Sequence, residues 1–235
     1  MCETPDPKSY EFFLATWQVY RKIVDGNYMY HREIFSEILN LLRKGAHRQP
    51  TILDLGCGDA GTIRPILEQT PFSSYTGADA SQPALEIAKL ELKAFGDQIE
   101  LQCSDMLSFL KANTSRKFGV ILASYSLHHL DTEQKRDFLA LCRQCLEARG
   151  LLIIVDVFRN ARQSREDYLD AYCQDMSHRW HSLTPEEGQI AIEHVRNHDF
   201  PESLENFLHI AEEAGLSIQD APLRHGYHAL TAFRA

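Results

Sequence analysis

The sequence predicts an α/β fold: a doubly wound, mostly parallel seven-stranded sheet with an antiparallel C-terminal strand, N-terminal helices and a helical lid insertion. Three observations carry this prediction. Apolar, strand-like segments alternate with helical patterns from residue 50 to residue 156, which is typical of a parallel sheet with helices on both faces. A glycine-rich turn directly follows the first apolar segment. A long polar helical segment then interrupts the alternation before the chain returns to strands.

The first stretch of the chain has a helical pattern. Aromatic and aliphatic residues recur every three to four positions between residues 10 and 44, and Gly45 ends the run. This spacing predicts two helices ahead of the first strand, within a helical cap of residues 1–47. The recurring residues are Phe13, Trp17, Tyr20, Val24, Tyr30, Ile34, Ile38 and Leu41.

The central stretch, residues 48–158, is the predicted core of the sheet. Its apolar runs are short and bounded by turn residues, as expected for strands that are buried on both faces. Strands are expected at residues 51–55, 74–78, 99–103, 118–123 and 151–157. Helices are expected near residues 62–69, 83–95, 106–112 and 132–148.

Residues 159–200 form the predicted insertion, because about forty residues of polar, His-rich helical pattern precede the next strand. Thr184, Pro185 and Glu187 have the spacing of a capping box with proline in the first turn, so a helix should begin there. The last part, residues 201–235, should hold a helix and two mutually antiparallel strands. We expect residues 1–235 to form a single domain.

The charge balance argues against a nucleic-acid partner. Lys and Arg total 24 against 33 Asp and Glu, which gives a net charge of −9, and no local run of basic residues offers a basic face. The longest apolar run, Leu151–Val155, is too short to span a membrane. The N-terminal residues also lack the order of a secretory signal. We therefore expect no membrane partner and a cytoplasmic location.

The most informative segment is TILDLGCGDAG, residues 51–61, in which Gly56, Gly58 and Gly61 form a GxGxxG pattern between a strand and a helix. Such a turn brings the main chain close to a ligand, and Asp79 lies at the right distance downstream to bind a ribose. The pattern fits both a nicotinamide dinucleotide and S-adenosylmethionine. Asp54 at the mouth of the turn would repel a pyrophosphate and attract the cationic groups of S-adenosylmethionine.

At these residues the chain resembles the class I, Rossmann-like S-adenosylmethionine-dependent methyltransferases. ILDLGCGDAG matches their glycine motif, and further matches follow in the order of the family: YTGADAS with Asp79, LQCSDM with Asp105, and SYSLHHL after the strand FGVILA. One departure is Ala60, which stands where the family often has its third glycine, with Gly61 one residue later. The resemblance covers residues 48–158 and the terminal helix and strands, and it makes residues 48–158 the cofactor-binding core.

The resemblance also implies which residues contact the cofactor. The glycine turn should lie against the methionine part, the second-strand acid against the ribose, and the third-strand acid against the adenine, since carboxylates accept hydrogen bonds from diols and amines. Each acid could instead cap a helix or lie in a solvated loop. The implied contacts are Asp54, Gly56, Cys57, Gly58, Asp79, Ala80, Asp105, Met106 and Ser124.

His128 is the candidate catalytic residue. It lies with His129 in the loop after the fourth strand, at the sheet edge where open α/β folds bind their ligands. SYSLHHLD is similar to the LHDW-type segment of some small-molecule O-methyltransferases, whose first histidine acts as a general base, and a histidine can take a proton from a hydroxyl or amine near neutral pH. Alternatively, the two histidines cap the next helix or pack under the insertion.

Aromatic residues are concentrated in the N-terminal stretch and the insertion. Most are interpreted as helix packing, whereas Tyr20, Tyr28, His31 and Tyr172 are expected to face the cofactor and the acceptor. Cys173, His178 and His181 match no strong zinc pattern, so the sequence predicts no metal site.

The sequence thus predicts a methyltransferase that uses S-adenosylmethionine and a small-molecule acceptor. An NAD(P)-dependent oxidoreductase and a noncatalytic S-adenosylmethionine-binding protein are the alternatives. The tetrapeptide of Asn or Asp, two prolines and an aromatic residue, used to methylate amino groups of bases and glutamine, is absent after the fourth strand. The identity of the acceptor, the atom methylated and the oligomeric state stay open.

Overall fold

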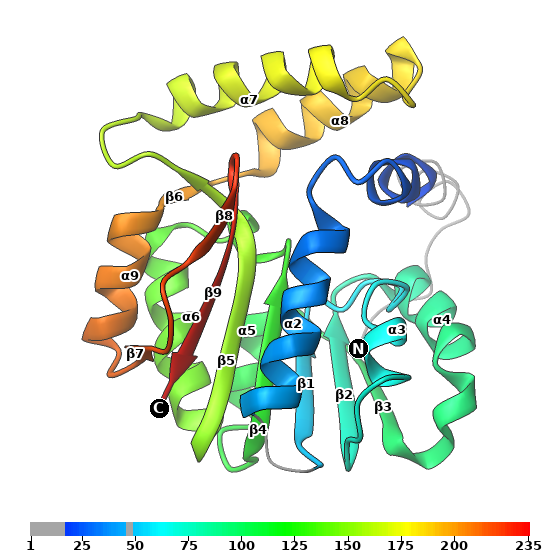
Figure 1. Ribbon diagram of the computed structural model, residues 1–235, viewed down its shortest axis with the longest axis vertical. Helices are drawn as coiled ribbons and strands as arrows, with labels where there is room; N and C mark the ends of the chain where they lie inside the picture. The colour runs from blue at the N-terminus through cyan, green and yellow to red at the C-terminus, as the bar shows by residue number, and fades with distance from the viewer. Residues whose placement is uncertain (1–16, 46–48) are drawn as a thin grey trace.

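The structure is a computed structural model that describes residues 17–45 and 49–235. A central sheet has helices on both faces, and a pair of helices lies beyond one end of its strands (Figure 1). The main path through the sheet has the order β3-β2-β1-β4-β5-β9-β7. These strands are β1 Thr51–Leu55, β2 Ser74–Asp79, β3 Ile99–Cys103, β4 Phe118–Ser124, β5 Leu146–Arg159, β7 Ser217–Ile218 and β9 His228–Arg234.

This topology confirms the predicted fold class. Strands β1 to β5 pair in parallel, and β9 runs antiparallel to both β5 and β7. The predicted strand count is corrected, because two short strands bring the sheet to nine within the described residues: β6 Glu202–Ser203 pairs with β5, and β8 Leu223–His225 pairs with β9. Segments of two or three residues are too short to show a periodic pattern, and they form here because a neighbouring strand offers an edge.

Two buried clusters cover the two faces of the sheet. Along β5, Leu152 and Ile154 join one cluster, and the intervening residues join the other, as expected for a strand covered on both faces. Phe138 and Phe207 fill the first cluster and Ile34 the second, all fully buried. The helices responsible are α2 His31–Gly45, α3 Arg64–Leu67, α4 Gln82–Glu91, α5 Met106–Ala112, α6 Thr132–Cys145 and α9 Leu204–Glu213.

The insertion consists of two helices, α7 Arg165–Arg179 and α8 Pro185–His198, beyond the carboxyl ends of the parallel strands (Figure 1). The predicted capping box is present: the Thr184 hydroxyl accepts from the Glu187 backbone N–H, and the Glu187 carboxylate accepts from the Thr184 backbone N–H. Among the described residues, no helix combines the length and apolarity needed to cross a membrane.

The N-terminal stretch lies at the same end of the strands as α7 and α8. Residues 17–25 are helical, and the predicted part of this helix before residue 17 lies outside the described residues. Val19, Ile23 and Met29 share a third buried cluster with residues of α7 and α8.

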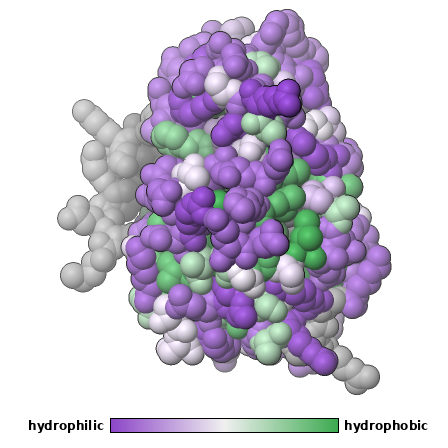
Figure 2. Space-filling model, turned by 90° about the vertical axis from the view of Figure 1, so that its left-hand side faces the viewer, coloured by the Kyte–Doolittle hydropathy of each residue, from purple (hydrophilic) through white to green (hydrophobic). Residues whose placement is uncertain are grey.

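One side of the surface is mainly hydrophilic, with hydrophobic residues visible in limited areas (Figure 2).

Candidate cofactor and acceptor site

The glycine turn after β1 combines unusual backbone angles with close packing. Gly56 and Gly58 have φ values of 76° and 55°, in the left-handed region that favours glycine. A Cβ atom at Gly56 would stand 2.5 Å from Cβ of Ser126, so glycine is needed there for space as well. The Gly56 and Cys57 N–H groups both donate to the Ala78 carbonyl, at 2.8 and 3.2 Å. The turn is thereby fixed against the end of β2.

Asp79 at the end of β2 holds two elements of the site together. Its Oδ2 accepts a hydrogen bond from the Gly58 N–H, and its Oδ1 accepts one from the Ser81 N–H, each at 2.8 Å. A carboxylate oxygen has more than one lone pair, so both oxygens can still accept from a diol. Burial raises the pKa of Asp79 above its ordinary value. The structure therefore places this acid against the glycine turn, as the ribose assignment requires.

Asp54 is a buried acid with one unsatisfied oxygen. Its side chain is 2% exposed, Oδ2 accepts from the Tyr75 hydroxyl at 2.8 Å, and Oδ1 has no hydrogen-bond partner. Burial raises the pKa of Asp54 to about 7 despite the Tyr75 hydrogen bond, which lowers it. An ionised carboxylate in such a place is stabilised by a nearby positive charge. The turn is thus suited to a cationic group of a ligand.

A first cavity, of about 410 Å³, opens beside this turn. Every predicted cofactor contact except Tyr28 and His31 lines it. Asp105 also caps α5, because its Oδ1 accepts a hydrogen bond from the Ser108 N–H at 2.9 Å. The same residue therefore both caps the helix and lines the cavity. The predicted residues in the cavity wall are Tyr20, Asp54, Gly56, Cys57, Gly58, Asp79, Ala80, Asp105, Met106 and Ser124.

Tyr28 and His31 are not in the walls of the two cavities described here. The Tyr28 ring stacks on Trp180 with 5.7 Å between ring centroids, and its hydroxyl accepts from the Ser182 N–H. His31 is buried with its ring 4.7 Å from that of Tyr125, and burial lowers the pKa of this imidazole to about 4. Their contact with the cofactor stays a prediction, since residue spacing does not tell which helix side faces the sheet and which faces a ligand.

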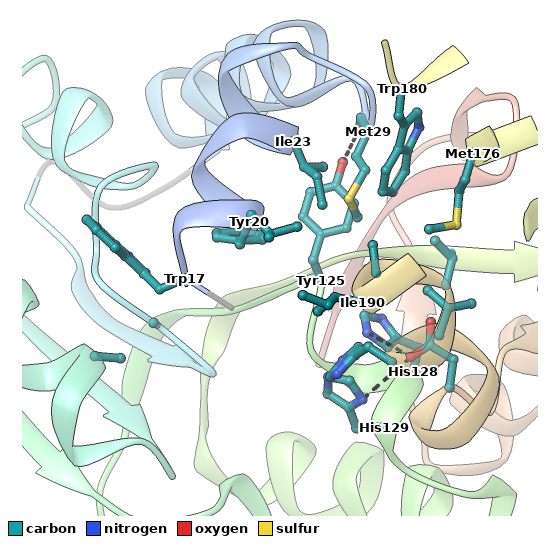
Figure 3. A pocket seen from close by; sticks show the side chains of 18 of the residues that line it. Trp17, Tyr20, Ile23, Met29, Tyr125, His128, His129, Met176, Trp180 and Ile190 are labelled. Carbon is teal, nitrogen blue, oxygen red and sulfur yellow. Dashed lines mark hydrogen bonds and ion pairs between the residues drawn. The ribbon is translucent and has the colours of Figure 1, made fainter. Parts of the chain in front are cut away.

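A second cavity, of about 380 Å³, adjoins the first and reaches under the insertion. Tyr20, Gly58, Asp79, Tyr125 and His129 belong to both walls. Tyr172, predicted to face the acceptor, also lines the second cavity. Its wall is mostly apolar and aromatic and, among the described residues, contains no Lys or Arg. Figure 3 shows side chains that converge on it from the N-terminal stretch and the insertion: Trp17, Ile23, Met29, Met176, Trp180 and Ile190.

His128 lies in the wall of the second cavity and is oriented by Asp156 of β5. Its Nδ1 and Asp156 Oδ1 are 2.6 Å apart, and its backbone N–H donates to Asp156 Oδ2 at 2.9 Å. Burial alone would lower the pKa of His128, but the carboxylates of Asp156 and Asp199 raise it to about 9. The side chain of Asp131, with Gln134, caps the following helix, so the alternative that the histidine side chains cap it does not hold.

Asp199 completes this part of the site and was not among the predicted residues. It follows the last turn of α8 and is 3% exposed, and its Oδ1 has no hydrogen-bond partner. This oxygen stands 3.8 Å from His128 Nε2 and 3.8 Å from His129 Nδ1. Both distances are too long for hydrogen bonds. Asp199 thus presents a free carboxylate oxygen to two imidazoles at the cavity wall.

Comparisons with known proteins agree with this geometry. Residues 53–152 match the sequence model of a family described as "Methyltransferase domain". A carboxy-S-adenosyl-L-methionine synthase from Desulfotalea psychrophila is 23% identical over 213 residues, 88% of this chain and 80% of the relative. These findings indicate a class I S-adenosylmethionine-dependent methyltransferase. The family confirms the recognition made from the sequence motifs and the cofactor predicted with it.

Solved methyltransferase structures share the fold at low sequence identity. An O-methyltransferase family 2 protein from Planctomyces limnophilus, in complex with apigenin, has a TM-score of 0.65 and 18% identity over 99% of this chain. This chain spans 62% of that protein. A magnesium protoporphyrin IX methyltransferase from Synechocystis with bound S-adenosylmethionine has a TM-score of 0.60 and 16% identity, over 92% of this chain and 84% of the other.

This methyltransferase has a further site residue that motif reasoning passed over. Asp59 lies inside the glycine motif itself and is 7% exposed. Its Oδ2 accepts from Trp17 Nε1 at 2.8 Å and its Oδ1 from the Gly61 N–H at 2.9 Å, which ties the N-terminal helix to the turn. An acid in the second variable position of the motif was a usable signal. Asp199 offered none, since its role depends on His128, which is 71 positions earlier in the sequence.

Proposed function

We propose that this protein transfers the methyl group of S-adenosylmethionine to a small, largely apolar acceptor bound in the second cavity. One observation carries the proposal: the two cavities share a wall at Gly58, Asp79, Tyr125 and His129. A cofactor in the first cavity would therefore meet an acceptor in the second. Methyl transfer from a sulfonium is an in-line displacement, so alignment of the two reactants and exclusion of water are the main tasks of the protein.

The first cavity supports S-adenosylmethionine over a nicotinamide dinucleotide. Asp79 would accept from the ribose hydroxyls, and the free oxygen of Asp54 would face the cationic methionine part. Neither Lys nor Arg is among the described residues that line this cavity, so a pyrophosphate would meet acids without a compensating positive charge. The oxidoreductase alternative is thereby disfavoured.

The charge of the second cavity limits the acceptor. With acids and histidines but no Lys or Arg in its described wall, it has no permanent cation to pair with a carboxylate or phosphate. The relatives named carboxy-S-adenosyl-L-methionine synthase have, by that name, a product with an added carboxylate. We therefore propose transfer of a methyl group and an acceptor that is neutral or cationic.

We propose that His128 meets the reacting group of the acceptor. Asp156 occupies Nδ1, so Nε2 is the nitrogen that faces the cavity wall beside Asp199. The role of general base, expected from the LHDW-like segment, stays a prediction. The proposal also includes a single-domain enzyme of the cytoplasm that binds neither nucleic acid nor membranes, in line with the net charge of −9.

Calorimetry with S-adenosylmethionine tests the proposal. The wild-type chain should bind one equivalent, Asp79→Ala should lose this binding, and Asp97→Ala, a control at an exposed aspartate, should retain it. An acceptor panel should then yield S-adenosylhomocysteine together with a methylated acceptor and one released proton. Unchanged affinity in Asp79→Ala would refute the ribose contact. Saturable binding of reduced nicotinamide cofactor, followed by fluorescence, would favour the oxidoreductase instead.

A further inference from the structure

The wall of the second cavity contains a cluster of metal-ligand side chains that the predicted role of His128 as a general base does not explain. His128, His129 and Asp199 each offer one ligand atom, and these atoms lie within 4.8 Å of one another. The two imidazoles are side by side below Tyr125 (Figure 3). This arrangement differs from the expectation of no metal, which considered only Cys173, His178 and His181.

We propose that His128, His129 and Asp199 bind a divalent transition-metal ion of the zinc class. Two imidazoles and one carboxylate suit zinc and its neighbours, whereas magnesium and calcium prefer sites built from oxygen ligands. Three protein ligands also leave one coordination position open, and all three residues line the cavity toward which it would face. The inference does not depend on the proposed methyl transfer, because the described side chains alone define the site.

The spacing of the ligand atoms is compatible with one ion. Atoms within 4.8 Å of one another have a point between them that is at most about 2.8 Å from each, and zinc–ligand distances are about 2.0–2.2 Å. Side-chain shifts of roughly 0.7 Å would therefore close the site. The 3.8 Å separation from Asp199 Oδ1 to His128 Nε2 exceeds a hydrogen bond and leaves room for a shared cation. His129 Nδ1 lies 3.2 Å from the His198 carbonyl oxygen, so His129 would bind the ion either through Nε2 or after Nδ1 leaves that carbonyl.

Two further features favour a cation at this point. Asp199 is only 3% exposed, yet its Oδ1 has no hydrogen-bond partner. A bound cation would satisfy this oxygen. Asp156 holds Nδ1 of His128, which leaves Nε2 as the ligand atom; a carboxylate behind a histidine is the usual support of a metal-bound imidazole. With an ion in place, the polar group of an acceptor would meet the open coordination position instead of Nε2.

A calorimetric titration of the chelator-treated protein, residues 1–235, with Zn²⁺ tests this site. Wild type should bind one equivalent. His129→Asn and Asp199→Asn should weaken binding at least tenfold, and Asp156→Asn should weaken it by about 10- to 100-fold through loss of the support. His178→Asn, an exposed histidine of α7, is the matched control and should bind like wild type. His129 has the most exposed side chain of the three ligands, at 41%, so its variant disturbs the fold least.

Co²⁺ absorption spectra supply a second measurement that identifies the ligand type. Nitrogen and oxygen ligands should give ligand-field bands without a thiolate charge-transfer band, and the bands should disappear in His129→Asn. A thiolate band, equal Zn²⁺ binding by wild type and His129→Asn, or no binding of either ion would overturn the metal site. Since binding of S-adenosylmethionine is measured separately and without metal, either proposal can fail while the other stands.

Discussion

Replacing Asp54 by asparagine should stabilise the free protein and weaken its binding of S-adenosylmethionine. Burial raises the pKa of Asp54 from 3.8 to about 7 in the folded state. The folded protein therefore prefers the protonated acid, and its stability falls as the pH rises from 3.8 through 7. The full cost of ionisation is about 4 kcal/mol above pH 7. Asparagine keeps the shape and does not ionise, so the stabilisation by Asp54→Asn should grow across this pH range.

The affinity for S-adenosylmethionine should rise as the pH rises, whereas the stability of the free protein falls. Only the ionised carboxylate attracts the cationic methionine part, and with a pKa of about 7 its ionised fraction rises about eightfold between pH 6 and pH 7.5. Affinity of the wild type should rise by a similar factor, about 1.2 kcal/mol, and affinity of Asp54→Asn should change much less.

Calorimetry at pH 6, 6.75 and 7.5 measures the affinity, and thermal melts of both chains at the same pH values measure the stability. Below pH 7.5 the α-amino group of the ligand stays mostly protonated, so the protein supplies the change. A wild-type affinity that does not vary over this range, or a lower melting temperature for Asp54→Asn than for wild type at pH 7.5, would refute the reasoning.

Three other substitutions test the framework of the site. Asp59→Asn replaces the charged acceptor of the Trp17 Nε1 and Gly61 N–H hydrogen bonds, so the free energy of unfolding should fall by about 1–3 kcal/mol. Tryptophan emission should also shift to the red. Unchanged emission would contradict the role of Asp59 in holding Trp17 against the glycine turn. Gly56→Ala places a Cβ atom 2.5 Å from Ser126 at a φ of 76°, and denaturant melts should show a loss of at least about 1–3 kcal/mol. The control Gly188→Ala, in open space within α8, should gain about 0.5–1 kcal/mol, and equal effects at the two glycines would be inconsistent with this account. Thr184→Ala removes the cap of α8 and should cost about 1 kcal/mol, measured by the same melts; a neutral result would show that packing alone sets this helix end.

The sequence determined the architecture of the core on its own. The buried runs of β1 and β4 are nearly uninterrupted, so the positions of these strands followed from local pattern. The candidate cofactor site was equally visible, because Gly56, Gly58 and Asp79 stand at the carboxyl ends of adjacent strands. Parallel pairing necessarily brings such ends together at one edge.

Tertiary structure decided everything that depends on two distant segments meeting. Whether Tyr28 faces a ligand or stacks on Trp180 depends on how the N-terminal stretch docks on α7, and no local pattern encodes that docking. Strand β6 exists because it pairs with β5, and strand β8 exists because it pairs with β9. Asp199 meets His128 only after the insertion folds back over the sheet, and packing between elements, unlike periodicity within one, cannot be read from neighbouring residues.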